Sequence, residues 1–177
     1  MRIAFFSPLN PQPSGISDYS EALLPHLARL VESIDVFIED YQPASPAAAQ
    51  NIHLRPWQEF EACYRAGRYE AVLYQIGNNP YHVYIYDQAL RVPGVVVLHE
   101  FNLHYLVAYA TVSRGDWDAY LREVERAGGP AALDHARRAQ AGEATLDFDG
   151  IALNRTLLER SRAVIVHSEY MERLLQS

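Results

Sequence analysis

Short apolar runs recur along the chain of 177 residues, and they constrain its fold more than any other feature. The clearest are residues 2–7, 34–38, 71–76, 94–98 and 163–166, each followed by a glycine, proline or polar residue. Runs of this kind are typical of strands that are buried on both faces of a parallel sheet. Helical stretches that begin near Asp18 and cover 57–66 and 84–91 alternate with them. This order predicts an α/β fold with a doubly wound, mostly parallel, Rossmann-like sheet.

The segment before the last strand is much longer than a single crossover helix, which needs ~10–15 residues. Its sequence has the pattern of helices at 105–112, 117–126, 131–141 and 153–160, and Gly128-Gly129-Pro130 interrupts them. No convincing strand lies in this part of the chain. We therefore expect one domain over residues 1–177, with a large helical insertion at about 104–162.

The composition excludes several kinds of chemistry. All 15 basic residues are arginine, so a Schiff-base lysine and a phosphate-loop lysine are both excluded. The single cysteine, Cys63, cannot form an internal disulfide or a multi-cysteine metal site, and we expect it to be buried. A net charge of −7 disfavours nucleic acid and anionic membranes as partners. No apolar run approaches the ~20 residues of a transmembrane helix.

Polar residues follow the predicted strands where ligands bind in open parallel sheets, outside the carboxyl ends of the strands. We expect strand 2–7 to neighbour strand 71–76, which in turn neighbours strand 94–98, so that three of the following loops line one crevice. The residues in these positions are Ser7 to Gly15, then Gly77, Asn78 and Asn79, then His99 and Glu100, and after the last strand His167, Ser168 and Glu169.

Gly15 lies where the first loop enters a helix. Glycine at this position lets backbone amides approach a phosphate or a sugar at the positive end of the helix. The alternative is a turn that requires a positive φ angle. Asn78 and Asn79 likewise allow two interpretations, because their amides suit a hydroxyl-rich ligand but are also common in turns.

His99 directly follows a strand, and we expect a hydrogen-bonding or acid/base group there, with a structural histidine as the alternative. On a helix, His99 and His104 would point ~140° apart, so we expect no metal site. Glu39 and Asp40 end strand 34–38, where dinucleotide-binding folds hold a ribose. Of the glycine fingerprint that such folds need, however, only Gly15 is present.

Four segments carry a resemblance to a known family: 1–27, with Pro13-Ser14-Gly15-Ile16-Ser17-Asp18-Tyr19-Ser20 in the glycine-loop position, then 74–82, 95–104 and 163–168. In this order they resemble the amino-terminal domain of family 4 (group 1) glycosyltransferases, which have the GT-B fold. The chain departs from the family at two positions. One glycine stands in the first loop where many members have two, and Glu100 stands where one branch of the family commonly has Asp.

The resemblance implies a retaining transfer of a sugar from a nucleotide-sugar donor, with no metal or other cofactor. His99 would be the catalytic residue that contacts the transferred sugar, and Gly15 would approach the donor phosphate or sugar. The helical insertion and the loop tips would hold the acceptor, which is a sugar, a lipid or another small molecule. The substrate-binding residues expected from the strand ends and the resemblance are Gly15, Ile16, Asn78, Asn79, Glu100, Ser168 and Glu169.

In such enzymes the donor nucleotide binds mainly to a second, carboxy-terminal domain. The resemblance therefore implies that this chain is the acceptor-side half of a larger enzyme and inactive alone. The lack of paired cysteines fits a cytoplasmic protein, and the resemblance is compatible with peripheral membrane attachment of the full-length protein. Two alternatives stay open: a stand-alone Rossmann-like module that binds a nucleotide or sugar phosphate without catalysis, and an NAD-dependent oxidoreductase.

Overall fold

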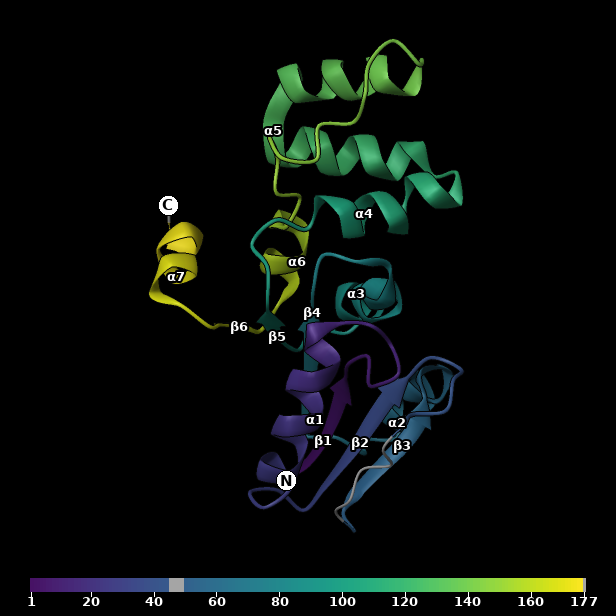
Figure 1. Ribbon diagram of the computed structural model, residues 1–177, viewed down its shortest axis with the longest axis vertical. Helices are drawn as coiled ribbons and strands as arrows, with labels where there is room; N and C mark the ends of the chain where they lie inside the picture. The colour runs from purple at the N-terminus through teal and green to yellow at the C-terminus, as the bar shows by residue number, and fades with distance from the viewer. Residues whose placement is uncertain (45–49, 177) are drawn as a thin grey trace.

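A computed structural model describes residues 1–44 and 50–176 of the chain, and a six-stranded sheet forms its centre (Figure 1). The strand order is β3-β2-β1-β4-β5-β6, and every neighbouring pair is parallel. The predicted α/β fold is confirmed, and so is the expected neighbourhood of the first, fourth and fifth strands. The strands are β1 (Arg2–Phe6), β2 (Ser33–Ile38), β3 (Ile52–Pro56), β4 (Ala71–Ile76), β5 (Val95–Leu98) and β6 (Ala163–Val166).

Helices and 3₁₀ turns connect β1 to β2, β3 to β4 and β4 to β5. These segments are α1 (Gly15–Leu27), the 3₁₀ turn η1 (Trp57–Glu59), α2 (Phe60–Arg65), the 3₁₀ turn η2 (Pro80–His82) and α3 (Val83–Arg91). The predicted start of the first helix near Asp18 is wrong, because Ser14 caps it by accepting a hydrogen bond from the N–H of Ile16. The carboxylates of Asp18 and Glu21 instead accept hydrogen bonds from Asn10 and hold the preceding loop.

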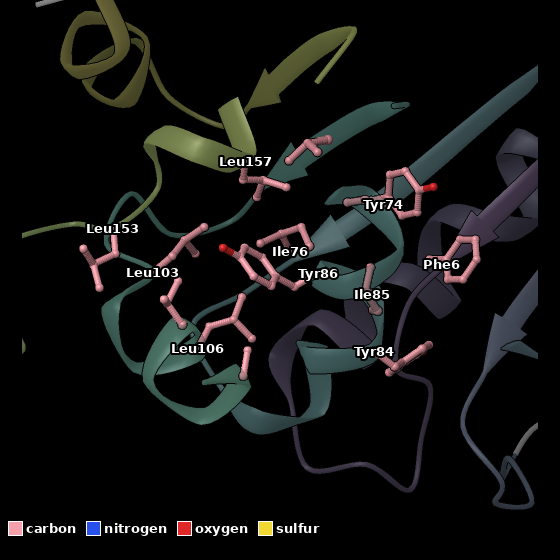
Figure 2. Packing of buried hydrophobic residues seen from close by; sticks show 14 of the residues in the cluster. Phe6, Tyr74, Ile76, Tyr84, Ile85, Tyr86, Leu103, Leu106, Leu153 and Leu157 are labelled. Carbon is pink, nitrogen blue, oxygen red and sulfur yellow. The ribbon is translucent and has the colours of Figure 1, made fainter. Parts of the chain in front are cut away.

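Alternate side chains of the strands enter two separate apolar clusters, as the pleat of a strand requires. Along β1, Phe5 packs with Leu24 of α1 on one face, whereas Phe6 packs on the other face. The second cluster is the larger, and Figure 2 shows Tyr74 and Ile76 of β4 in it. Side chains from α3, from α4 (His104–Ala110) and from the insertion cover them there. Helices therefore flank both faces of the sheet, although the edge strand β6 stays partly exposed, with Ile165 47% exposed.

The insertion between β5 and β6 is helical, as predicted. After α4 it contains the 3₁₀ turn η3 (Val112–Arg114), α5 (Trp117–Gln140) and α6 (Arg155–Arg160). Gly129 has a φ of 72° and a ψ of −165°, which interrupts α5 and confirms two predicted helices separated by the Gly-Gly-Pro sequence. Figure 1 shows α4 and both halves of α5 beyond the carboxyl edge of the sheet. The insertion therefore lies on the side where ligands bind in this class of fold.

The chain ends with α7 (Glu169–Gln176), which follows the edge strand β6. Cys63 on α2 is half-buried, so the expectation that its thiol is fully buried is wrong.

Candidate functional site

Several loops meet at the carboxyl edge of the sheet because all its strands run in the same direction. The loop after β1 leads into α1, and β4 and β5 are followed by η2 and α4. The helix α1 follows β1, and its first turns contact the residues that directly follow β4 and β5, the next two strands of the sheet. This meeting point is the candidate site.

Gly77, directly after β4, is where α1 touches the edge of the sheet. A Cβ atom at Gly77 would lie 2.4 Å from Cδ1 of Ile16 and 3.1 Å from Nε2 of His82. Any larger residue would therefore require the end of the Ile16 side chain to move. The sequence-predicted residue Ile16 is buried at this contact and fixes where the helix begins over the end of β4.

His99 lies at the centre of the candidate site, half-buried at the end of β5. Its Nε2 atom lies 2.8 Å from Oε1 of Gln75, a residue of β4. Its ring also contacts Tyr19 of α1, with ring centroids 4.9 Å apart, and His167 after β6, at 4.7 Å. Three strands and one helix thus bring these four side chains together. We call Tyr19, Gln75, His99 and His167 the edge cluster.

The surroundings of His99 keep its ring neutral. Burial, together with the nearby charges that His167 and His82 would carry, lowers the pKa of His99 to about 4. The Oε1 atom of Gln75 can only accept a hydrogen bond, so in this arrangement Nε2 of His99 carries the proton and donates it. The Nδ1 atom is then left with a lone pair that can accept a hydrogen bond.

Two polar atoms are buried behind His99 without a hydrogen-bond partner among the described residues: Nε2 of Gln75 and Nε2 of His82. The Nδ1 atom of His82 donates to the backbone oxygen of Gln75 over 2.9 Å. Burial lowers the pKa of His82 to about 4, so this ring is also neutral near pH 7. The site therefore rests on neutral polar groups, not on an ion pair.

Gly15 is the first residue of α1, and its surroundings are open. Its φ angle is not positive, so the alternative that a turn requires glycine here is wrong. A Cβ atom at Gly15 would meet no other atom within 4 Å. The open space and the positive end of the helix suit the approach of an anionic or hydroxylated ligand.

Asn78 and Glu100 bind each other at the ends of β4 and β5. The N–H of Asn78 donates to Oε1 of Glu100 over 3.0 Å, and Oδ1 of Asn78 accepts from the N–H of Leu106 over 2.9 Å. These bonds fasten the start of α4 to the edge of the sheet. The structure thus places both predicted residues beside the edge cluster, where they connect the loops.

Three other predicted residues have capping or helix-start positions. Oδ1 of Asn79 accepts from the N–H of Tyr81 over 3.0 Å and caps η2, as the turn interpretation predicts. Oγ of Ser168 accepts from the N–H of Met171 over 3.2 Å at the start of α7. Glu169 is the exposed first residue of that helix. No contact recorded within the described part of the chain joins these three side chains to His99.

His104 has a structural role. Its Nδ1 lies 3.0 Å from the backbone oxygen of Ile151, and its Nε2 lies 2.7 Å from the hydroxyl of Tyr120. Both ring nitrogens are therefore occupied, in contrast to those of His99. The acidic pair Glu39 and Asp40 lies at another part of the edge and lines a hollow of about 430 Å³ beside the ends of β2 and β3. Burial raises the pKa of Glu39.

Sequence reasoning missed two members of the edge cluster, Tyr19 and Gln75. It placed His167 at the end of the last strand but did not include it among the expected substrate-binding residues. One signal could have found Gln75, because it is the single amide-bearing residue in the otherwise apolar or aromatic run 71–76. A buried polar residue in such a run needs a partner. Tyr19 carries no such signal, since only the folded chain brings it to His99.

None of the described helices is both long enough and apolar enough to cross a membrane. Comparisons with models of protein families, with curated proteins and with solved structures find no match to this chain.

Proposed function

We propose that this chain is the acceptor-side domain of a retaining glycosyltransferase. The enzyme would move a sugar from a nucleotide-sugar donor to a sugar, a lipid or another small-molecule acceptor. The observation that carries the proposal is the neutral ring of His99, held by Gln75 beside the first turns of α1 at the carboxyl edge of the sheet. The resemblance of four segments to family 4 glycosyltransferases supports it.

The reaction exchanges one bond at the anomeric carbon of the sugar for another. The bond from C1 to the phosphate oxygen breaks, a bond from C1 to the acceptor oxygen forms, and the acceptor's proton passes to the departing phosphate. Positive charge develops at C1 as the first bond breaks. A protonated histidine would oppose this charge, whereas the neutral ring of His99 does not.

His99 would position the sugar through its free ring nitrogen. Because Nε2 donates to Gln75, Nδ1 can accept a hydrogen bond from a hydroxyl of the transferred sugar. The first turn of α1 would face the departing phosphate, whose negative charge the positive end of the helix favours. Gly15 leaves space for that approach. Ser168 and Glu169 stay predictions as further substrate-binding residues.

The test is nucleoside diphosphate release by the protein expressed from its complete reading frame. The donors are UDP-glucose, UDP-N-acetylglucosamine and GDP-mannose, each offered with a panel of sugar and lipid acceptors. We expect acceptor-dependent release with one donor, and a loss of about 100-fold or more in His99→Ala, in the range found for a group that acts in the transition state. His53→Ala, an exposed histidine on β3, is the matched control and should leave the rate unchanged.

Full activity in His99→Ala would contradict the assigned role of His99. Tight binding of a nucleotide or sugar phosphate by the whole protein, without turnover of any donor, would favour the non-catalytic binding module. Tight and specific binding of NAD would favour the oxidoreductase, with Glu39 and Asp40 as the ribose contacts.

A further inference from the structure

Three aromatic side chains form an exposed group on the insertion, outside the edge cluster. Tyr105 and Tyr109 lie on α4, and Phe148 lies on the loop before α6. The three residues are 42%, 38% and 36% exposed, which is unusual for rings of this size. Their rings are contiguous, with centroids 5.2 Å apart for Tyr105 and Tyr109 and 5.5 Å apart for Tyr105 and Phe148. We call these three residues the aromatic platform.

The aromatic platform is held in place from below. Asn102 donates from Nδ2 to the backbone oxygen of Phe148 over 2.8 Å, and its Oδ1 accepts from the N–H of His104 over 2.8 Å. The ring of His104 also packs against that of Phe148, with centroids 5.1 Å apart. One amide side chain thus binds both the start of α4 and the loop that carries Phe148. Rings that are already ordered lose little conformational freedom when a ligand binds.

The aromatic platform adjoins the candidate site. The start of α4 is fastened to β4 through the hydrogen bond between Asn78 and Leu106, and Glu100 binds the same asparagine. Figure 1 shows α4 beyond the carboxyl edge, on the side of the sheet where His99 lies. A molecule on the tyrosines of α4 would therefore lie at the same edge of the sheet as the candidate site.

The chemistry of the aromatic platform fits a pyranose ring. The C–H face of a sugar packs on the electron-rich face of an aromatic ring, and its hydroxyls bind carboxylates and phenol groups. The two tyrosines supply hydroxyls, and the exposed residues Asp147 and Asp149 flank Phe148. Both carboxylates act electrostatically on His104 beneath the aromatic platform, where they oppose the lowering of its pKa by burial.

The same features disfavour other occupants. An anionic lipid surface would be repelled by these carboxylates and by a chain with a net charge of −7 and no lysine. A second copy of the chain needs an interface of roughly 800 Å² on each partner, far more than three partly exposed rings provide. We propose that the aromatic platform stacks a neutral pyranose unit of the acceptor, an inference that rests on the proposed function and names its acceptor class as a glycan.

The test is solution NMR of this chain with methyl β-D-glucopyranoside, methyl α-D-mannopyranoside and maltopentaose as probes. We expect the ring protons of Tyr105, Tyr109 and Phe148 to shift with at least one probe. Tyr105→Ser should weaken binding about tenfold, the loss that one stacking contact predicts. Tyr105→Phe keeps the ring and should bind nearly as well. Tyr170→Ser is the matched control. It removes a tyrosine on α7 that is 66% exposed, and it should leave binding unchanged.

Several outcomes would overturn the proposal. These are no ring shifts with any probe, equal binding by Tyr105→Ser, ring-dependent binding to phosphatidylglycerol vesicles, or self-association that Tyr105→Ser abolishes. The thermal midpoint of each variant shows whether a loss reflects unfolding. His53→Ala, at an exposed histidine on β3, should bind the pyranosides as the unchanged chain does. Binding without any sugar transfer by the whole protein would refute the proposed function alone, whereas transfer with an acceptor KM that Tyr105→Ser leaves unchanged would refute the platform alone.

Discussion

Two buried polar side chains in the sheet, Asp35 and Gln75, differ in the groups that bind them. On β2, Oδ2 of Asp35 lies 2.7 Å from Nε of Arg55 and 3.1 Å from Nε of Arg68, and it accepts from the hydroxyl of Tyr69 over 2.6 Å. On β4, the hydrogen bonds recorded for Gln75 outside the sheet join neutral groups: its Oε1 binds the ring of His99, and its backbone oxygen accepts from the ring of His82. Both residues are almost completely buried, with exposures of 1% and 0%. The first group is a compensated charge, and the second is a set of neutral dipoles.

The comparison separates a group that stabilises the fold from one that is available for chemistry. Asp35 has two positive partners and a phenol donor on Oδ2, whereas its Oδ1 is buried without a hydrogen-bond partner among the described residues. In the edge cluster, His99 is half-buried, and its Nδ1 has no hydrogen bond recorded within residues 1–44 and 50–176. Each group thus holds one buried atom without a partner, so what separates them is the neighbour: Gln75 binds a half-buried histidine, whereas Asp35 binds arginines and a tyrosine.

The largest effect on stability should come from Asp35→Ala. This change leaves two arginines without their shared carboxylate, and we expect the free energy of unfolding to fall by about 3 kcal/mol, the lower end of the range for a broken buried ion pair. The lower end applies because the side chain of Arg68 is 42% exposed and can be rehydrated. Urea unfolding measures the change. A loss below about 1 kcal/mol would show that the Asp35 group matters no more than a surface ion pair.

Acid should destabilise the folded chain through His82, which binds the backbone of Gln75. His82 has a pKa of about 4 in the folded chain and about 6.5 when unfolded. Between these values the unfolded chain binds a proton that the folded chain does not, so stability is lost as the pH falls from about 6.5 to about 4 and then levels off. We expect His82 to contribute about 3 kcal/mol to this loss.

The control for this acid effect is His82→Asn, because the Nδ2 of asparagine can replace Nδ1 of His82 as the donor to Gln75. Urea unfolding between pH 7 and pH 4 should give a shallower loss for the variant than for the unchanged chain. Parallel curves would mean that His82 is not the group that titrates.

Most of the fold could be predicted from the sequence. Apolar runs such as 71–76 and 94–98 have the form of parallel strands, and the crossover rule then leaves few strand orders. The start of the first helix was harder, because Ser14 and Asp18 are both good capping residues. Which of them caps depends on Asn10, whose backbone N–H binds Glu21 and whose side chain binds Asp18 only in the folded loop.

The candidate site was only partly predictable. The rule that ligands bind at strand ends identified Gly15 and His99, and the structure places them near the first turns of α1 and the end of β5. The same rule could not separate His99 from residues that only cap helices, such as Asn79 and Ser168. Capping is decided by local backbone geometry, whereas the edge cluster depends on packing between distant segments.

Gln75→Glu should change the protonation of His99. A carboxylate would then face Nε2 of the ring across 2.8 Å, and an opposite charge at this distance favours the imidazolium. We expect the pKa of His99 to rise from about 4 by roughly two units, which NMR titration of the ring measures directly. An unchanged pKa of His99 would show that Gln75 does not face the ring in solution.

Gln75→Leu should have the smallest effect on stability and gives the sharpest contrast with Asp35. Leucine has nearly the same volume, and the lost amide already has one atom without a partner, so we expect a change of less than about 1 kcal/mol. Asp35→Leu is the matched control and should cost considerably more stability, because it leaves charged partners behind.

Gln75→Leu should also change the protonation of the His99 ring. Because Nε2 loses its acceptor, the proton can occupy either ring nitrogen. Nitrogen chemical shifts of the ring distinguish a single Nε2–H form from a mixture. A single form that persists in Gln75→Leu would mean that another group orients His99, and a large loss of stability would place Gln75 with Asp35 among the residues that hold the fold.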